Sequence, residues 1–267
     1  MKPAPVVGVF DSGVGGLSVL RALRIALPGA HFIYLADEAM APYGERDATV
    51  LRERIAAVVN ALHRQHPLDA MVVACNTATA VAIDVLRQSH PTLPFVGIEP
   101  ALRPALRQSA SGQVGVVATR ATLSSERYAR LRASCLDEAP ASSRLIEQPC
   151  DGLAEAIESG DENRVAMLCN TYLGDIRNRA PALDTLVLGC THYPLAARHW
   201  KTGEGLTLID PAEAVARRTQ ALLPAVAVTG TGTTSLLSTG TGARLGEAAR
   251  RWLDLSLPVG ALPPGCA

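Results

Sequence analysis

Short apolar runs alternate with amphipathic segments along this chain. The runs expected to form strands are β-branched and nearly continuous in apolar character: Val6–Phe10, Phe32–Leu35, Ala70–Ala74, Phe95–Ile98, Val114–Ala118, Thr185–Leu188 and Leu206–Ile209. Strands that are buried on both faces of a parallel sheet have this composition. Leucines at helical spacing fill the gaps, as in the segment 17–27 before the Pro28-Gly29 breaker. The alternation predicts βαβ units, and therefore an α/β fold with mostly parallel sheets.

A faint internal repeat divides the chain. The segment Val7–Gly13 resembles Val114–Arg120, and each is followed at a similar distance by a cysteine and two polar residues. These later segments are Ala74-Cys75-Asn76-Thr77 and Gly189-Cys190-Thr191-His192. Their matched order favours duplication over coincidence. Near the C-terminus we expect one short strand, Ser235–Leu237, within a loop, and a frayed end from Pro258 to Ala267.

Composition narrows the function classes. Lys+Arg and Asp+Glu both number 25, and aromatic residues make up 4%. A nucleic-acid partner is not expected, because binders need basic surfaces and aromatic platforms. No apolar run reaches the ~18 residues of a membrane span, and Met1–Pro5 has no signal-peptide character. We therefore expect a cytoplasmic protein, no membrane partner and reduced cysteines. Without a Cys-x-x-Cys pair, no metal site is expected.

Candidate chemistry gathers where predicted strands end. In open α/β sheets, ligands bind beyond the carboxyl ends of the strands, beside helix N-termini that favour anions and thiolates. Four groups of polar residues follow strands in this way: Asp11 and Ser12 with the loop 13–16; Cys75, Asn76 and Thr77; Thr119 to Thr122; and Cys190, Thr191 and His192. No arginine is evidently placed to clamp a carboxylate, so we expect neutral side chains and backbone N–H groups to bind a substrate.

Each of these residues also has a structural interpretation. The loop Gly13–Gly16 lacks the lysine of a phosphate loop and is explained by a tight turn. Cysteine is usually a small core residue, which we expect for Cys135, Cys150, Cys169 and Cys266. For Cys75 and Cys190 the two interpretations are evenly balanced. Asp11 serves either as a helix cap or to tune a thiol, and His192 either as a cap or as a base.

Two thiols in equivalent positions suit one reaction class. Racemisation removes a proton from one face of a carbon and returns one to the other face, so it needs two acid/base groups in opposite protonation states. Pyridoxal phosphate, the usual alternative, needs a lysine at the site. The chain has only Lys2 and Lys201, and neither follows a predicted strand. The pattern therefore favours a cofactor-independent mechanism.

At these residues the chain resembles the cofactor-independent aspartate/glutamate racemase family. The resemblance runs from Val7 to about Ala221 and rests on five motifs: Val9–Leu17, Pro42–Gly44, Ala74–Ala80, Gly115–Thr119 and Leu186–Leu195. It implies an enzyme that interconverts L- and D-glutamate without a cofactor and supplies D-glutamate for peptidoglycan. It also implies two similar α/β domains, residues 1–97 with 210–267 and residues 98–209, with glutamate bound in the cleft between them. A homodimer is compatible with it.

The resemblance also assigns the site. It implies that Cys75 and Cys190 are the two bases, assisted by Asp11 and His192 respectively. Glu158, eight residues after Cys150, matches the position of an additional acid. The implied substrate contacts are Asp11, Ser12, Pro42, Tyr43, Gly44, Asn76, Thr77, Thr119, Thr122, Thr191 and His192.

The chain departs from the family pattern before the Pro42 motif. Many members read Gly-Asp-Thr where this chain has Ala36-Asp37-Glu38, and Ala39-Met40-Ala41 also differs. These changes bear on the mouth of the cleft more than on its chemistry. The alternatives are aspartate or hydantoin racemase, a one-cysteine decarboxylase or isomerase, and a non-catalytic ligand-binding relative. No N-terminal extension of the kind linked to activator control is seen, so such regulation is not expected.

Overall fold

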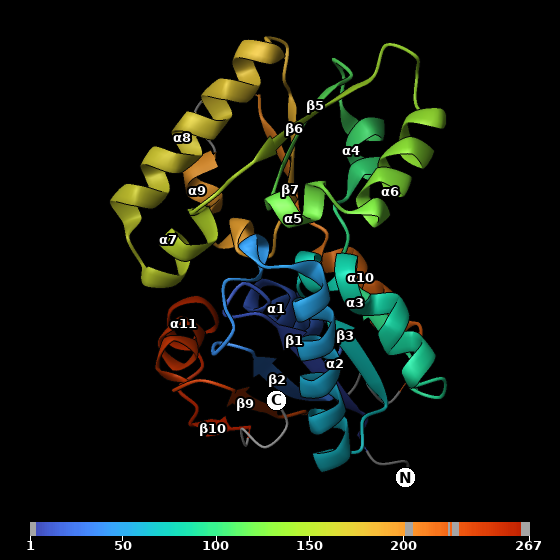
Figure 1. Ribbon diagram of the computed structural model, residues 1–267, viewed down its shortest axis with the longest axis vertical. Helices are drawn as coiled ribbons and strands as arrows, with labels where there is room; N and C mark the ends of the chain where they lie inside the picture. Colours follow the sequence, from blue (N-terminus) through green and yellow to red (C-terminus); the bar gives the residue numbers. More distant parts are fainter. Residues whose placement is uncertain (1–3, 201–204, 224, 226–229, 263–267) are drawn as a thin grey trace.

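The computed structural model describes residues 4–200, 205–223, 225 and 230–262, and the strands of these residues form two parallel sheets. The first sheet has the order β10-β9-β2-β1-β3-β4 and the second β6-β5-β7-β8. Figure 1 shows the sheets in separate halves of the molecule. The strands are β1 (Val6–Asp11), β2 (His31–Ala36), β3 (Ala70–Val73), β4 (Phe95–Gly97), β5 (Gln113–Ala118), β6 (Arg144–Pro149), β7 (Thr185–Gly189), β8 (Thr207–Ile209), β9 (Thr234–Ser238) and β10 (Val259–Ala261).

Helices cover both faces of each sheet (Figure 1). One face of the first sheet packs on α1 (Leu17–Ala26), α10 (Ala212–Gln220) and α11 (Ala243–Leu253), the other on α2 (Ala48–Gln65) and α3 (Asn76–Ser89). The second sheet lies between α7 (Leu153–Ser159), α8 (Glu162–Arg179) and α9 (Ala197–Trp200) on one face and α4 (Leu102–Gln108) and α6 (Glu126–Asp137) on the other. Short helices α5 (Arg120–Leu123), η1 (Tyr43–Glu45) and η2 (Tyr193–Ala196) follow strand ends. The near-continuous apolar strands follow from this burial on both faces.

The two sheets share one core topology. The order β2-β1-β3-β4 in the first matches β6-β5-β7-β8 in the second, so β1 corresponds to β5 and β3 to β7. Asp11 therefore ends β1, and Thr119 follows the equivalent strand β5. In the same way, Cys75 follows β3 and Cys190 follows the equivalent strand β7. The sequence repeat and the strand order describe the same internal symmetry, and β9 and β10 extend the first sheet beyond it.

The predicted α/β class with parallel sheets is confirmed, because every strand pair is parallel. The strand β6 was missed: only Leu145 and Ile146 are apolar and buried in this edge strand, whose other side chains include Glu147 and Gln148. The frayed end was wrong for 258–262, since Val259–Ala261 pairs with β9 and Leu262 is buried. Residues 263–267 lie outside the described residues.

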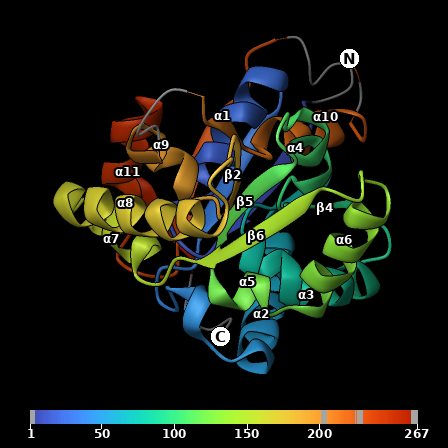
Figure 2. The same ribbon diagram turned by 90° about the horizontal axis from the view of Figure 1, so that it is seen from above.

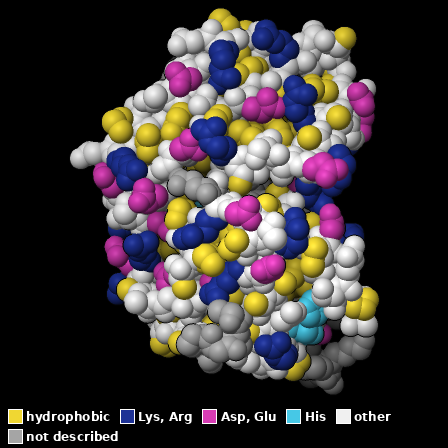
Figure 3. Space-filling view, in the orientation of Figure 1, with side chains coloured by type: hydrophobic (Ala, Val, Ile, Leu, Met, Phe, Trp, Pro, Cys, Tyr) yellow, Lys and Arg dark blue, Asp and Glu magenta, His cyan; other side chains and the backbone are white. Residues whose placement is uncertain are grey.

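The surface carries charged side chains of both signs. Basic and acidic side chains are intermixed over the face drawn in Figure 3 rather than gathered into one large basic area. Among the described residues, no helix is long and apolar enough to cross a membrane.

Candidate active site

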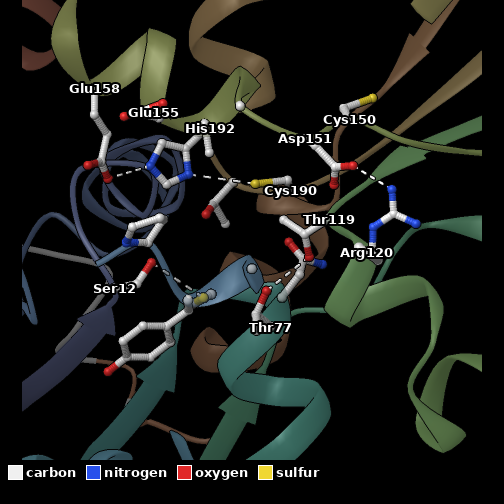
Figure 4. A pocket seen from close by; sticks show the side chains of 18 residues that line it. Ser12, Thr77, Thr119, Arg120, Cys150, Asp151, Glu155, Glu158, Cys190 and His192 are labelled. Carbon is white, nitrogen blue, oxygen red and sulfur yellow. Dashed lines mark hydrogen bonds and ion pairs between the residues drawn. The ribbon is translucent and has the colours of Figure 1, made fainter. Parts of the chain in front are cut away.

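A cavity of about 220 Å³ lies where the carboxyl ends of the two sheets face each other. Figure 4 shows side chains from both halves pointing into it. It brings together most of the residues that the sequence predicted, namely Ser12, Pro42, Tyr43, Gly44, Cys75, Asn76, Thr77, Thr119, Glu158, Cys190, Thr191 and His192. The strand-end rule explains this convergence, because most of these residues directly follow β1, β3, β5 or β7.

Two predicted residues lie behind the cavity wall. Asp11 is fully buried, and its carboxylate accepts hydrogen bonds from the Gly13 N–H at 2.8 Å and the Thr191 hydroxyl at 3.3 Å. Thr122 is also buried, and its hydroxyl accepts from the Thr119 hydroxyl at 2.9 Å. Neither lines the cavity. Both residues position side chains that do.

Cys75 lies at the junction of β3 and α3. It is the N-cap of α3, and its sulfur accepts the Ala78 N–H at 3.4 Å. The thiol lies 3.8 Å from the Ser12 hydroxyl oxygen, the contact marked in Figure 4. Burial, and then the nearby Asp11 carboxylate, raises the pKa of Cys75 to about 12. Cys75 is therefore a protonated thiol near neutral pH.

Cys190 has a different set of neighbours. Its sulfur lies 3.6 Å from His192 Nδ1, and His192 Nε2 lies 2.8 Å from Glu158 Oε1. Burial lowers the pKa of His192, but the bonds to Cys190 and Glu158 outweigh it, so the pKa is well above its ordinary value. Burial raises the pKa of Glu158, yet the His192 bond leaves it lowered. The pair is therefore charged, and it places an imidazolium 3.6 Å from the Cys190 sulfur.

The glycines of the loop 13–16 allow this ion pair to approach the first half. A Cβ on Gly13 would collide with the Glu158 carboxylate, and one on Gly15 would collide with the His192 ring. The Val14 N–H also donates to Glu158 Oε1 at 3.4 Å. The glycines are thus explained by close packing against the acid/base residues of the other half, without any phosphate ligand.

Asn76 carries unused hydrogen-bonding capacity into the cavity. It is buried, and neither its side-chain oxygen nor its nitrogen has a partner among the described residues. Buried polar groups are nearly always paired, because leaving one unpaired costs about 1–3 kcal/mol. A cavity-lining amide in this state is suited to a polar ligand that supplies both a donor and an acceptor.

The segment Ala36-Asp37-Glu38, in which Ala36 and Glu38 depart from the family pattern, supports the rim of the cavity. The Asp37 carboxylate accepts the Tyr43 hydroxyl at 2.6 Å and receives Arg54 through two nitrogens, at 3.0 and 2.8 Å. Since Tyr43 and Gly44 line the cavity, this cluster fixes their position. Glu38 accepts the Ser238 hydroxyl and the N–H groups of Gly242 and Leu245, which attaches the start of α11 to the same loop.

Several lining residues were not predicted: Arg120, Cys150, Asp151, Gly152, Ala154 and Glu155. Arg120 corrects the expectation that no arginine is placed near the site, although it is paired with Asp151 at 2.5 Å. Its place directly after Thr119 was available from the strand-end rule. Cys150 was expected to be a core residue; it is buried, with its sulfur 3.4 Å from the Gln148 carbonyl oxygen, and also borders the cavity. The residues 151–155 follow the missed strand β6, so no strand end pointed to them.

Comparison with known proteins agrees with this geometry. A family model described as Asp/Glu/Hydantoin racemase matches residues 15–219. A glutamate racemase of Ectopseudomonas mendocina is 47% identical over 221 residues, which cover 81% of each chain.

Solved structures extend the likeness over the whole fold. Glutamate racemase isoform RacE1 from Bacillus anthracis has a TM-score of 0.85 at 31% identity, covering 98% of this chain and 99% of its own. Escherichia coli glutamate racemase, solved with L-glutamate and the activator UDP-MurNAc-Ala, has a TM-score of 0.79 at 30% identity, covering 97% and 98%. The chain therefore belongs to the Asp/Glu/hydantoin racemase family, and its activity is that of the glutamate racemases.

Proposed function

We propose that the chain interconverts L- and D-glutamate by transferring the α-proton between two cysteines, Cys75 and Cys190. One observation carries this proposal. The two cysteines follow equivalent strands of two similar sheets and line a single cavity from opposite halves. A substrate bound between them presents one face of its α-carbon to each sulfur.

The protonation states support a two-base reaction. In the free protein Cys75 is a thiol, and the imidazolium of His192 lies 3.6 Å from the Cys190 sulfur. The Cys190 thiolate removes the α-proton from one enantiomer and becomes a thiol, leaving a carbanion at the α-carbon. The Cys75 thiol then donates its proton to the opposite face and becomes a thiolate. The opposite enantiomer reacts through the same steps in reverse, so no proton or electron is gained or lost overall.

The supporting groups have distinct roles in this proposal. His192, held by Glu158, stabilises the thiolate form of Cys190. Burial keeps Cys75 in its thiol form, and Asp11 adds to this effect, because a neighbouring negative charge disfavours a second one. The pKa of Asp11 is itself raised by burial, and the His192 charge only partly offsets this shift. Asp11 is thus a positioning residue, whereas the two cysteines are the catalytic residues.

Glutamate is the substrate that fits the polar lining. A dicarboxylate needs donors, and an ammonium group needs acceptors. Asn76, Thr77, Thr119 and Thr191 supply neutral donors and acceptors, and Arg120 lies at the rim, paired with Asp151. The Escherichia coli relative binds L-glutamate in its solved structure. We extend this to the chain, with production of cytoplasmic D-glutamate for peptidoglycan, and with residues 1–97 and 210–267 forming one domain and 98–209 the other.

Circular dichroism tests the function directly. L-glutamate and D-glutamate, each incubated with the protein, should lose optical activity without added pyridoxal phosphate. In deuterated water the α-carbon should acquire deuterium. Activity that depends on pyridoxal phosphate would overturn the two-cysteine mechanism. L-aspartate in parallel is expected to react much more slowly; faster turnover of aspartate would assign the chain to the aspartate branch of the reaction.

A further inference from the structure

A second cavity, of about 710 Å³, opens beside the first and shares Gly44 and Arg120 with it. Its walls come from both halves of the molecule: η1, α2 and α3 on one side and α5 and α6 on the other. In Figure 2, α5 lies close to α2 and α3, in agreement with the packing of α5 and α6 on α3. We call this cavity the arginine groove, after Arg46, Arg52, Arg120, Arg127 and Arg130 in its lining.

The carboxylates of the arginine groove are already engaged. Asp47 caps α2, accepting the N–H groups of Thr49 and Val50 at 2.8 and 3.1 Å. Asp84 of α3 pairs with Arg127 of α6 at 3.2 Å, across the two halves. Glu126 pairs with Arg130 at 2.7 Å. Arg120 pairs with Asp151 and Arg127 also pairs with Glu99, both at 2.5 Å, so of the five arginines only Arg46 and Arg52 have no carboxylate partner among the described residues.

Arg46 and Arg52 are each held by a backbone carbonyl group. Arg46 donates through Nε to the Met40 carbonyl at 2.6 Å, and Arg52 through Nε to the Val81 carbonyl at 3.1 Å. These bonds hold each guanidinium but use only the inner nitrogen. Among the described residues, neither side chain has a carboxylate partner, so the two outer nitrogens of each remain available. A guanidinium group with two available nitrogens can donate hydrogen bonds to two oxygens of one phosphate group.

We infer that the arginine groove binds a small anion with two phosphate groups, held by Arg46 and Arg52 on the first half and lying against the α5 and α6 wall of the second half. The volume suits a small molecule rather than a single ion. Such a ligand would contact both halves beside the mouth of the catalytic cavity. Its binding would therefore alter the affinity for glutamate without occupying the substrate position.

Inorganic pyrophosphate, without divalent cations, is the probe that tests this inference. Calorimetric titration of the full chain should show saturable binding of one pyrophosphate. The double variant Arg46→Gln with Arg52→Gln should weaken it by about tenfold or more, because each lost contact is a hydrogen bond to a charged group. A matched control is Arg218→Gln with Arg250→Gln, which removes two exposed arginines elsewhere and should bind like the original chain.

A second measurement separates the groove from the catalytic cavity. Pyrophosphate should still bind in the presence of saturating D-glutamate, and should change the KM for glutamate in the original chain but not in the Arg46/Arg52 variant. Basal racemisation of that variant should be unchanged. The inference would be overturned if pyrophosphate showed no saturable binding, or if the double variant bound it equally well. It would also be overturned if pyrophosphate inhibited both the original chain and the double variant in a purely competitive way. Because binding is measured without turnover, this result is independent of the proposed racemase mechanism.

Discussion

The two halves of the molecule share a strand order but surround their cysteines differently. Cys75 follows β3 and caps a helix of 14 residues, whereas Cys190 follows β7 and precedes a short 3-10 helix. Cys75 has a serine hydroxyl and a helix N–H as neighbours, whereas Cys190 has an imidazolium held by a carboxylate. The shared topology places two sulfurs on opposite sides of one cavity, and the different neighbours give the two sulfurs different electrostatic surroundings. A symmetric pair of environments would give both sulfurs the same charge, which a two-base reaction cannot use.

The largest expected effect comes from removing either sulfur. Cys75→Ser and Cys190→Ser should each lower racemisation by about 10³-fold or more, since each removes an acid/base group. Circular dichroism of both glutamate enantiomers measures the loss. Cys135→Ser is a matched control, because Cys135 is buried in the core between α4, α6 and the second sheet, away from the cavity. If either single variant were fully active, that cysteine would have no role in the mechanism. The proposal that one cysteine from each half acts as an acid/base group would then be wrong.

The second effect tests the ion pair that only the second half has. Glu158→Gln removes the carboxylate that raises the pKa of His192, so this pKa should fall towards its ordinary value of about 6.5. The imidazolium then disappears as the pH rises through that region, whereas in the original chain it persists to higher pH. We expect kcat at pH 8 to fall about 10–100-fold, with partial recovery on acidification.

The control for this prediction is Glu155→Gln. Glu155 also lines the cavity, but it is paired with Arg164 at 3.1 Å rather than with His192. Its pH–rate profile should match that of the original chain. If the Glu158→Gln profile were also parallel to the original, Glu158 would have no role in charging His192.

A smaller effect tests whether the Asn76 side chain binds glutamate or stabilises the fold. Asn76→Ala removes a side-chain amide that has no partner among the described residues, so the free energy of unfolding without ligand should stay the same or rise slightly. The KM for glutamate should rise by about tenfold, because a hydrogen bond to a charged group is lost. Urea unfolding and initial rates measure the two quantities. The exposed residue Asn170 provides the control Asn170→Ala. A clear loss of stability with unchanged KM would show that Asn76 serves the fold.

The smallest expected effect concerns the weak contact of Cys75. Ser12→Ala removes the hydroxyl at 3.8 Å and should lower kcat/KM about two- to fivefold. Because L- and D-glutamate have equal free energies, kcat/KM must fall equally for both. The asymmetry should appear instead in the α-deuterium isotope effect, which rises more for the enantiomer whose proton Cys75 removes. Equal isotope effects for both enantiomers would contradict a role for Ser12 on one side only.

The sequence predicted the elements that have a strong local signal. The strands β1, β3, β5 and β7 are apolar and flanked by polar residues, so their carboxyl ends identified Cys75, Cys190 and the residues around them. It failed for β6, where burial at a sheet edge requires only two apolar residues, and for β10, where pairing with β9 outweighs a turn-rich composition. Arg120 was passed over because a side chain next to a predicted residue gives no indication of where it points.

The sequence by itself determined the fold class, the repeat and the two cysteines, because burial on both strand faces and the strand-end position leave a local pattern in the chain. Only the tertiary structure decided the distances and hydrogen bonds around each sulfur. Glu158 lies 34 residues from His192 in sequence yet 2.8 Å away in space. Asp11 lies 180 residues from Thr191 and accepts its hydroxyl hydrogen bond. Protonation depends on burial and charge at a few ångströms, and these distances are set by how the two halves pack together.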